Sequence, residues 1–145
     1  MNRYIAMIML LAAMPAMSCL MFKKPIMITQ VVEEKARIDA ADNPALQEMI
    51  RRDLGKRRIE LAGLTVKDIL PAANIDYDFC VTADVTTPRG MVECHIYSDN
   101  LKTIAQLQKG KTKINVKGEF GRFFTLIDNY YTRLEVVNAR ITIVP

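Results

Sequence analysis

The side chains with the greatest chemical reactivity are three cysteines and the single histidine: Cys19, Cys80, Cys94 and His95. A thiol beside an imidazole is the pairing that activates a cysteine nucleophile. Cys94 and His95 are adjacent in an expected strand, where successive side chains point to opposite faces, so they do not form such a pair. Cys80 can share a face with His95, but no orienting third group or oxyanion site accompanies them. We therefore expect no enzyme activity and no catalytic residue.

The cysteine spacing matches no zinc site, and we expect no metal ion or cofactor. A disulfide between Cys80 and Cys94 is conceivable in an oxidising compartment. The expected alternation places Cys94 inside the domain and Cys80 outside, so the bond would need a bulge to bring both sulfurs to one side. The sequence leaves this pairing open.

Aromatic and basic residues near the C-terminus are the best candidates for a ligand site. Gly121-Arg122-Phe123-Phe124 and Asp128-Asn129-Tyr130-Tyr131 place four aromatic rings near an expected loop between the last two strands. Such rings can stack on a flat ligand, or they can simply plug the end of the domain and pack. Together with the side chains expected on the outer face of the sheet, the candidate ligand-binding residues are Tyr97, His95, Arg122, Phe123, Tyr130 and Tyr131.

The N-terminus has the organisation of an export signal. Asn2-Arg3 precede an unbroken apolar run from Ile5 to Ala13, and Pro15 ends it. Small residues at positions 16 and 18 then precede Cys19, as at a signal cleavage site. The apolar run is too short to span a bilayer, which needs about 20 residues. We assign residues 1–18 to a signal segment and place the protein in the cell envelope.

The segment Ala16-Met17-Ser18-Cys19 resembles the lipobox of bacterial lipoproteins. That resemblance implies lipidation of Cys19 and a membrane anchor made of acyl chains. Two alternatives stay open: cleavage without lipidation, which would release a periplasmic protein, and an uncleaved anchor, since Tyr4–Phe22 is nearly all apolar.

The remaining chain is divided into a tether and one domain. Residues 19–40 are expected to form the tether, which can include a helical stretch near 31–41, and residues 41–145 the domain. Asn43 and Pro44 are typical of a helix start, and Gly55 of a helix end. Apolar residues spaced by three or four between them predict one buried helix face: Leu46, Met49, Ile50 and Leu54.

From Lys56 onward the apolar period changes to two, which indicates strands. The parity shifts across Ala62-Gly63 and again near Val137-Asn138, and both shifts predict β-bulges. We expect a first strand from residue 56, then strands over about 77–85, 91–97, 111–120 and 132–144. A short helix capped by Ser98 or Asp99 separates the third strand from the fourth. Alternation places Phe79, Val81, Ala83, Val85, Val92, Cys94 and Ile96 inside.

This order predicts a mainly β domain: a five-stranded OB-fold-like barrel (β-β-β-α-β-β) preceded by an N-terminal helix. Closure into a barrel removes the exposed edges that five strands would leave in an open sheet.

Four segments carry a family resemblance: Leu54–Gly63, Val92–Ile96, Leu107–Gly118 and Val136–Ile141. They resemble the tRNA-anticodon-like OB-fold family over about residues 40–143. The shared positions are glycines and apolar residues, so the resemblance implies a barrel and not an activity. Many members of that family are exported proteins or lipoproteins of uncharacterised role.

The net charge of +4 is too small to imply nucleic-acid binding by itself. The face that OB-folds use for ligands would carry three carboxylates here and no Lys or Arg, the wrong sign for phosphate. The cations gather in two other places, residues 51–58 and 109–117. The sequence thus favours a non-catalytic binding module for a protein, peptide or small ligand. The alternative is a domain that binds oligonucleotides or anionic polymers, and an enzyme using Cys80 and His95 ranks third.

Overall fold

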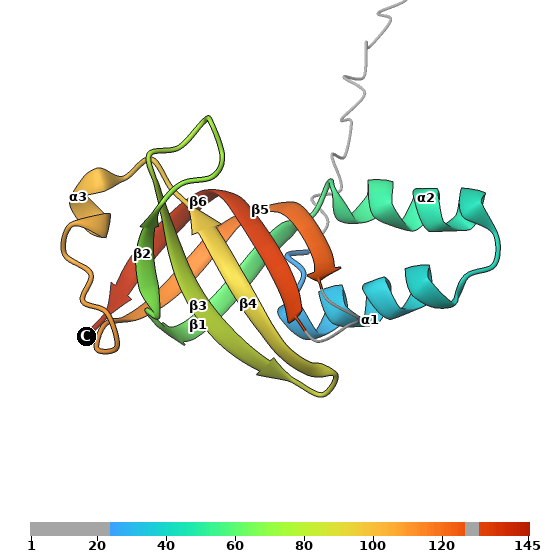
Figure 1. The fold of residues 1–145 in the computed structure, drawn as a ribbon, viewed down its shortest axis with the longest axis horizontal. Helices are drawn as coiled ribbons and strands as arrows, with labels where there is room; N and C mark the ends of the chain where they lie inside the picture. The colour runs from blue at the N-terminus through green and yellow to red at the C-terminus, as the bar shows by residue number, and fades with distance from the viewer. Residues whose placement is uncertain (1–23, 127–130) are drawn as a thin grey trace, which may run out of the picture.

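A computed structural model describes residues 24–126 and 131–145 of the chain. Two helices, α1 (Ile28–Ala40) and α2 (Pro44–Leu54), precede a mainly β region. The strands are β1 (Arg58–Thr65), β2 (Asp68–Pro71), β3 (Phe79–Thr87), β4 (Gly90–Tyr97), β5 (Lys113–Leu126) and β6 (Tyr131–Val144), with the four-residue α3 (Leu101–Ile104) before β5. Figure 1 shows the helix pair at one end of a strongly curved sheet.

The predicted start of α2 is confirmed, because the Asn43 side chain accepts a 2.9 Å hydrogen bond from the Ala45 N–H and Pro44 is the first helical residue. The tether was expected over residues 19–40, but within the described residues it gives way to a helix at Ile28. Ile28–Ala40 forms α1, and its Val31 side chain is fully buried in the common core. Helix α1 is therefore part of the folded domain.

The six strands form one sheet in the order β1-β5-β6-β4-β3-β2, with β4 and β6 parallel and every other neighbouring pair antiparallel. The expected five-stranded closed barrel differs in two respects: there are six strands, and the sheet is not closed. The expected first strand is divided at Val66-Lys67, where the chain changes hydrogen-bonding partner. The Val66 N–H donates to the Thr112 carbonyl and the Lys67 N–H to the Thr82 carbonyl. Pro71, expected in a loop, ends β2 at the sheet edge, where a missing N–H is tolerated.

Both predicted bulges are confirmed. Gly63 has a φ of 66°, and the β1–β5 register shifts between Leu61 and Leu64. The Gly63 N–H donates to Asn115 Oδ1 at 2.8 Å. Asn138 has a φ of 48°, and the β5–β6 register shifts nearby. The bulges bend β1 and β6 around a shared core.

The predicted alternation holds in the middle of the strands and fails at an end. Val81, Ala83, Cys94 and Ile96 are fully buried as expected. Phe79 was expected inside but is 39 % exposed, because β3 pairs with β4 only from Cys80 onward and Phe79 lies beyond that ladder.

Two boundaries also differ from expectation. Gly121-Arg122-Phe123-Phe124 lies within β5, not in the loop after it. Asn100, not Ser98 or Asp99, caps α3: its side chain accepts from the Thr103 N–H. The longer β5 brings its aromatic residues beside the helix pair.

Candidate functional site

The outer face of β3 and β4 was expected to present ligand-binding side chains. The register confirms which residues share this face, since Cys80 pairs with Tyr97 and Thr82 with His95. The face is nevertheless covered: His95 is 8 % exposed and Tyr97 2 % exposed. The ring of Tyr77 lies 5.4 Å from that of Tyr97 and helps to cover it. Neither predicted residue presents an open surface to a ligand.

Charges on this outer face are paired with one another. The Lys67 ammonium donates to Asp84 at 3.0 Å and to Glu93 at 2.8 Å, and these hydrogen bonds raise the pKa of Lys67. The other oxygen of Glu93 lies 2.5 Å from His95 Nε2. Such a network holds the sheet surface together and leaves little unbalanced charge for a ligand.

The thiols of Cys80 and Cys94 are free. Cys94 is buried on the inner face of the sheet and Cys80 on the outer face, as predicted. The two cysteines form no disulfide with each other. Burial raises the pKa of Cys80 to about 11 and that of Cys94 to about 12. Since the thiolate is the nucleophile, neither cysteine is poised to react near neutral pH.

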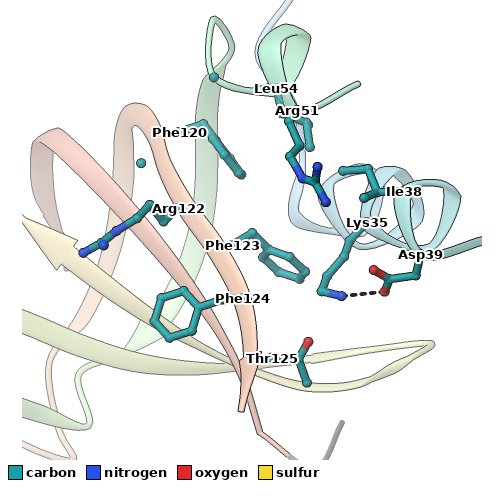
Figure 2. A pocket seen from close by; sticks show the side chains of 12 residues that line it. Lys35, Ile38, Asp39, Arg51, Leu54, Phe120, Arg122, Phe123, Phe124 and Thr125 are labelled. Atoms are coloured by element: carbon teal, nitrogen blue, oxygen red, sulfur yellow. Dashed lines mark hydrogen bonds and ion pairs between the residues drawn. The ribbon is translucent and has the colours of Figure 1, made fainter. Parts of the chain in front are cut away.

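A pocket of about 690 Å³ lies between α1, α2 and the second half of β5. Its size is typical of a small-molecule site. Figure 2 shows the lining side chains, which come from all three elements. They are Lys35, Ile38, Asp39, Arg51, Leu54, Gly55, Phe120, Gly121, Arg122, Phe123, Phe124 and Thr125.

The pocket combines apolar walls with cationic groups. Phe120 and Phe123 of β5 face Ile38 and Leu54 of the helices across it (Figure 2). The Lys35 ammonium forms an ion pair with Asp39 and lies 6.0 Å from the centre of the Phe123 ring. An apolar cavity with a few convergent polar groups is the usual composition of a ligand site.

Arg51 supplies the unbalanced charge of this pocket. Its side chain is exposed and extends from α2 into the open space (Figure 2). Among the described residues, its guanidinium has no ion-pair or hydrogen-bond partner. A guanidinium in this setting matches a carboxylate or phosphate group.

The predicted ligand residues are thus dispersed. Phe123 lines the pocket, and so does the stem of Arg122, but the Arg122 guanidinium turns away and donates to Glu135 at 2.8 Å. That hydrogen bond raises the pKa of Arg122. Cys19, Tyr130 and the Tyr131 side chain lie outside the described residues.

Sequence reasoning missed the helical half of the pocket. Lys35 and Ile38 were assigned to the tether, and Arg51 was grouped only with the other cations of residues 51–58. One signal was present: Val31, Lys35 and Ile38 are separated by four and then three residues, the spacing of a single helix face. That spacing places Lys35 on the stripe that packs toward the sheet.

Within residues 24–126 and 131–145, no group of three or more His, Cys, Asp or Glu side chains is arranged to hold a metal ion. None of the described helices is both long enough and apolar enough to cross a bilayer. Neither the family models nor the curated protein sequences with which the chain was compared give a match.

Proposed function

We propose that this protein is a non-catalytic OB-fold binding module of the cell envelope, anchored through a lipidated Cys19. Its site is the pocket between α1, α2 and β5, and its ligand is a small molecule or peptide end that joins an apolar body to one anionic group. The observation that carries the proposal is the guanidinium of Arg51 beside apolar walls, which has no partner within residues 24–126 and 131–145.

The OB-fold assignment is supported by the strand order. If β1 and β2 are two halves of one bent first strand, that strand forms both edges of the sheet. The strands between its two halves are then β3, β4, β6 and β5, in that order. Only two residues, Val66 and Lys67, separate the halves. The parallel pairing of β4 with β6 and the helix before β5 agree with the same topology.

The ligand class follows from the complementarity of the pocket. Lys35 is balanced by Asp39 and Arg122 by Glu135, so Arg51 is left to meet an external anion. The aromatic and aliphatic walls favour an apolar group of matching size. A carboxylate gains bidentate hydrogen bonds from arginine, which a neutral alcohol cannot reproduce.

An oligonucleotide-binding role has less support. The sheet face that such domains use is filled here by internal ion pairs, and it carries the carboxylates of Asp84 and Glu93. Anisotropy measurements with a single-stranded oligonucleotide provide a direct comparison. Salt-sensitive oligonucleotide binding would favour this second function.

The test of the pocket is calorimetric titration of the full chain, held in phosphatidylcholine nanodiscs, with phenylbutyrate and its neutral analogue phenylbutanol. We expect phenylbutyrate to bind more tightly. Arg51→Gln should weaken its binding about fivefold, since a partly exposed charge pair contributes about 1 kcal/mol. Arg51→Gln should leave phenylbutanol binding unchanged.

Arg52→Gln is the matched control, because Arg52 neighbours Arg51 on the same helix but pairs with Glu48 and does not line the pocket. Its affinity for phenylbutyrate should equal that of the natural chain. Equal loss in the two variants, or no binding of either probe, would refute the assignment of the pocket.

A further inference from the structure

A second hollow, of about 470 Å³, lies along α1 and α2 and shares only Leu54 with the first pocket. We call it the helix groove. Its apolar lining includes Ile26, Leu46, Met49 and Ile50. Leu46 is 42 % exposed and Met49 67 % exposed, so the apolar surface of α2 is accessible from solvent.

The charge around the helix groove is net positive. Four cationic residues line it, Arg37, Arg52, Lys56 and Arg57, against two acids, Glu34 and Asp53. Arg37 pairs with Glu34 at 2.7 Å, Arg52 pairs with Glu48 at 2.9 Å, and Arg57 lies 3.6 Å from Asp53. The Lys56 ammonium has no partner among the described residues. An apolar strip with basic residues around it is the pattern of surfaces that lie in the headgroup region of anionic bilayers.

The position of the helix groove in the chain brings it close to the proposed anchor. Ile26 lines the groove and is fixed there, since its N–H donates to the Arg58 carbonyl at 2.7 Å and it bridges Ile59. Cys19 lies seven residues earlier. Whatever conformation the intervening chain adopts, seven residues span at most about 25 Å. Acyl chains on Cys19 would therefore hold the groove within that distance of the lipid surface.

We propose that the helix groove rests on an anionic phospholipid bilayer, with Leu46 and Met49 among the headgroups and Lys56 against lipid phosphates. This inference rests on the proposed anchoring through Cys19. Docking on this face fixes the orientation of the domain on the membrane. The anchor alone would leave the orientation free.

The absence of tryptophan from the chain provides a clean test. Met49→Trp places the only tryptophan of the chain in the helix groove, and Ile75→Trp places it in the loop between β2 and β3, at a residue that is 99 % exposed. Both full-length variants are reconstituted into phosphatidylcholine vesicles with or without phosphatidylglycerol. Co-flotation reports the anchor, and quenching of tryptophan by brominated lipid reports docking.

We expect both variants to float with both kinds of vesicle. With phosphatidylglycerol, Met49→Trp should emit at shorter wavelength and be quenched at least about twofold more than Ile75→Trp. High salt should reduce the difference, because it screens the basic residues. Adding Lys56→Glu should also reduce it, whereas Lys111→Glu, an exposed lysine outside the groove, should not.

The outcomes separate the two proposals. Flotation with equal quenching at both positions would overturn docking and leave the anchor standing. Failure to float would overturn the anchor and the docking inference with it. Neither result bears on phenylbutyrate binding, which tests the other pocket.

Discussion

Cys94 has no solvent exposure, and burial raises the pKa of its thiol to about 12, against an ordinary value near 9. Between these pH values the folded state keeps the proton that the unfolded state releases. Stability must therefore fall as the pH rises above about 9, by up to roughly 1.4 kcal/mol per pH unit for a single group.

Cys94→Ala removes this contribution. We expect the variant to be less stable at pH 7, because the lost sulfur leaves a small void, but to lose stability more slowly between pH 9 and 11. Urea unfolding at a series of pH values measures both effects. Thr29→Ala, at an exposed position of α1, serves as the control and should follow the natural chain. Parallel curves for the natural chain and Cys94→Ala would argue against the raised pKa.

Alternation along the strands was sufficient to place Cys94 inside and His95 on the other face. It could not indicate whether that other face is open. Its cover comes from Tyr77, in the loop before β3, and from two ion pairs: Lys67 with Glu93 of β4, and Arg122 of β5 with Glu135 of β6. The exposure of His95 therefore depends on the positions of other elements, which local spacing does not record.

At the scale of elements, β6 leaves no room for a side chain at Gly118 of β5. A methyl group there would lie 2.5 Å from Val136 Cγ1 and 2.9 Å from the Val137 carbonyl oxygen. We expect Gly118→Ala to lower the free energy of unfolding by about 1–3 kcal/mol through overpacking, as measured by urea denaturation.

Gly55→Ala provides the comparison, because Gly55 has an α-helical φ of −61° and its nearest atom would be 3.5 Å away. It should leave stability unchanged or raise it slightly, since alanine restricts the unfolded chain more than glycine does. Equal effects of the two substitutions would mean that the close approach at Gly118 is not a constraint.

Bulges were predictable because each leaves a parity shift, marked by Gly63 in one case and Asn138 in the other. The extension of β5 was not. Gly121 suggested a turn, yet it lies within the strand. Its glycine fits the close packing there, because a Cβ atom would lie 3.0 Å from the Glu135 carbonyl oxygen. A glycine required for close packing and a glycine required for a turn look the same in a sequence.

At the scale of the whole molecule, the pocket exists only because the helix pair packs against one end of the sheet. Phe123 was identifiable as an aromatic residue near a ligand site. Its partners Lys35 and Arg51 belong to helices that are far from it in sequence, and no local pattern fixes where those helices lie. The half of the site on β5 could be predicted in part, whereas the half on α1 and α2 needed the tertiary structure.

Because α1 shares the core with β1, damage to its buried face should destabilise the entire domain. Val31 is fully buried and belongs to the same apolar cluster as Ile59 of β1. Val31→Ala should lower the free energy of unfolding by about 2 kcal/mol, from lost burial and the remaining cavity. The slope of the unfolding free energy against urea concentration should stay the same, since one cooperative unit still unfolds. Thr29→Ala, an exposed change on the same helix, should cost less than about 0.5 kcal/mol.

If α1 were instead a separate tether, Val31→Ala would match Thr29→Ala, or α1 would melt before the sheet and the far-ultraviolet signal would change in two steps. A single step at lower urea would tie the helix wall of the pocket to the stability of the sheet, so that a ligand bound in the pocket should shift the unfolding of both together.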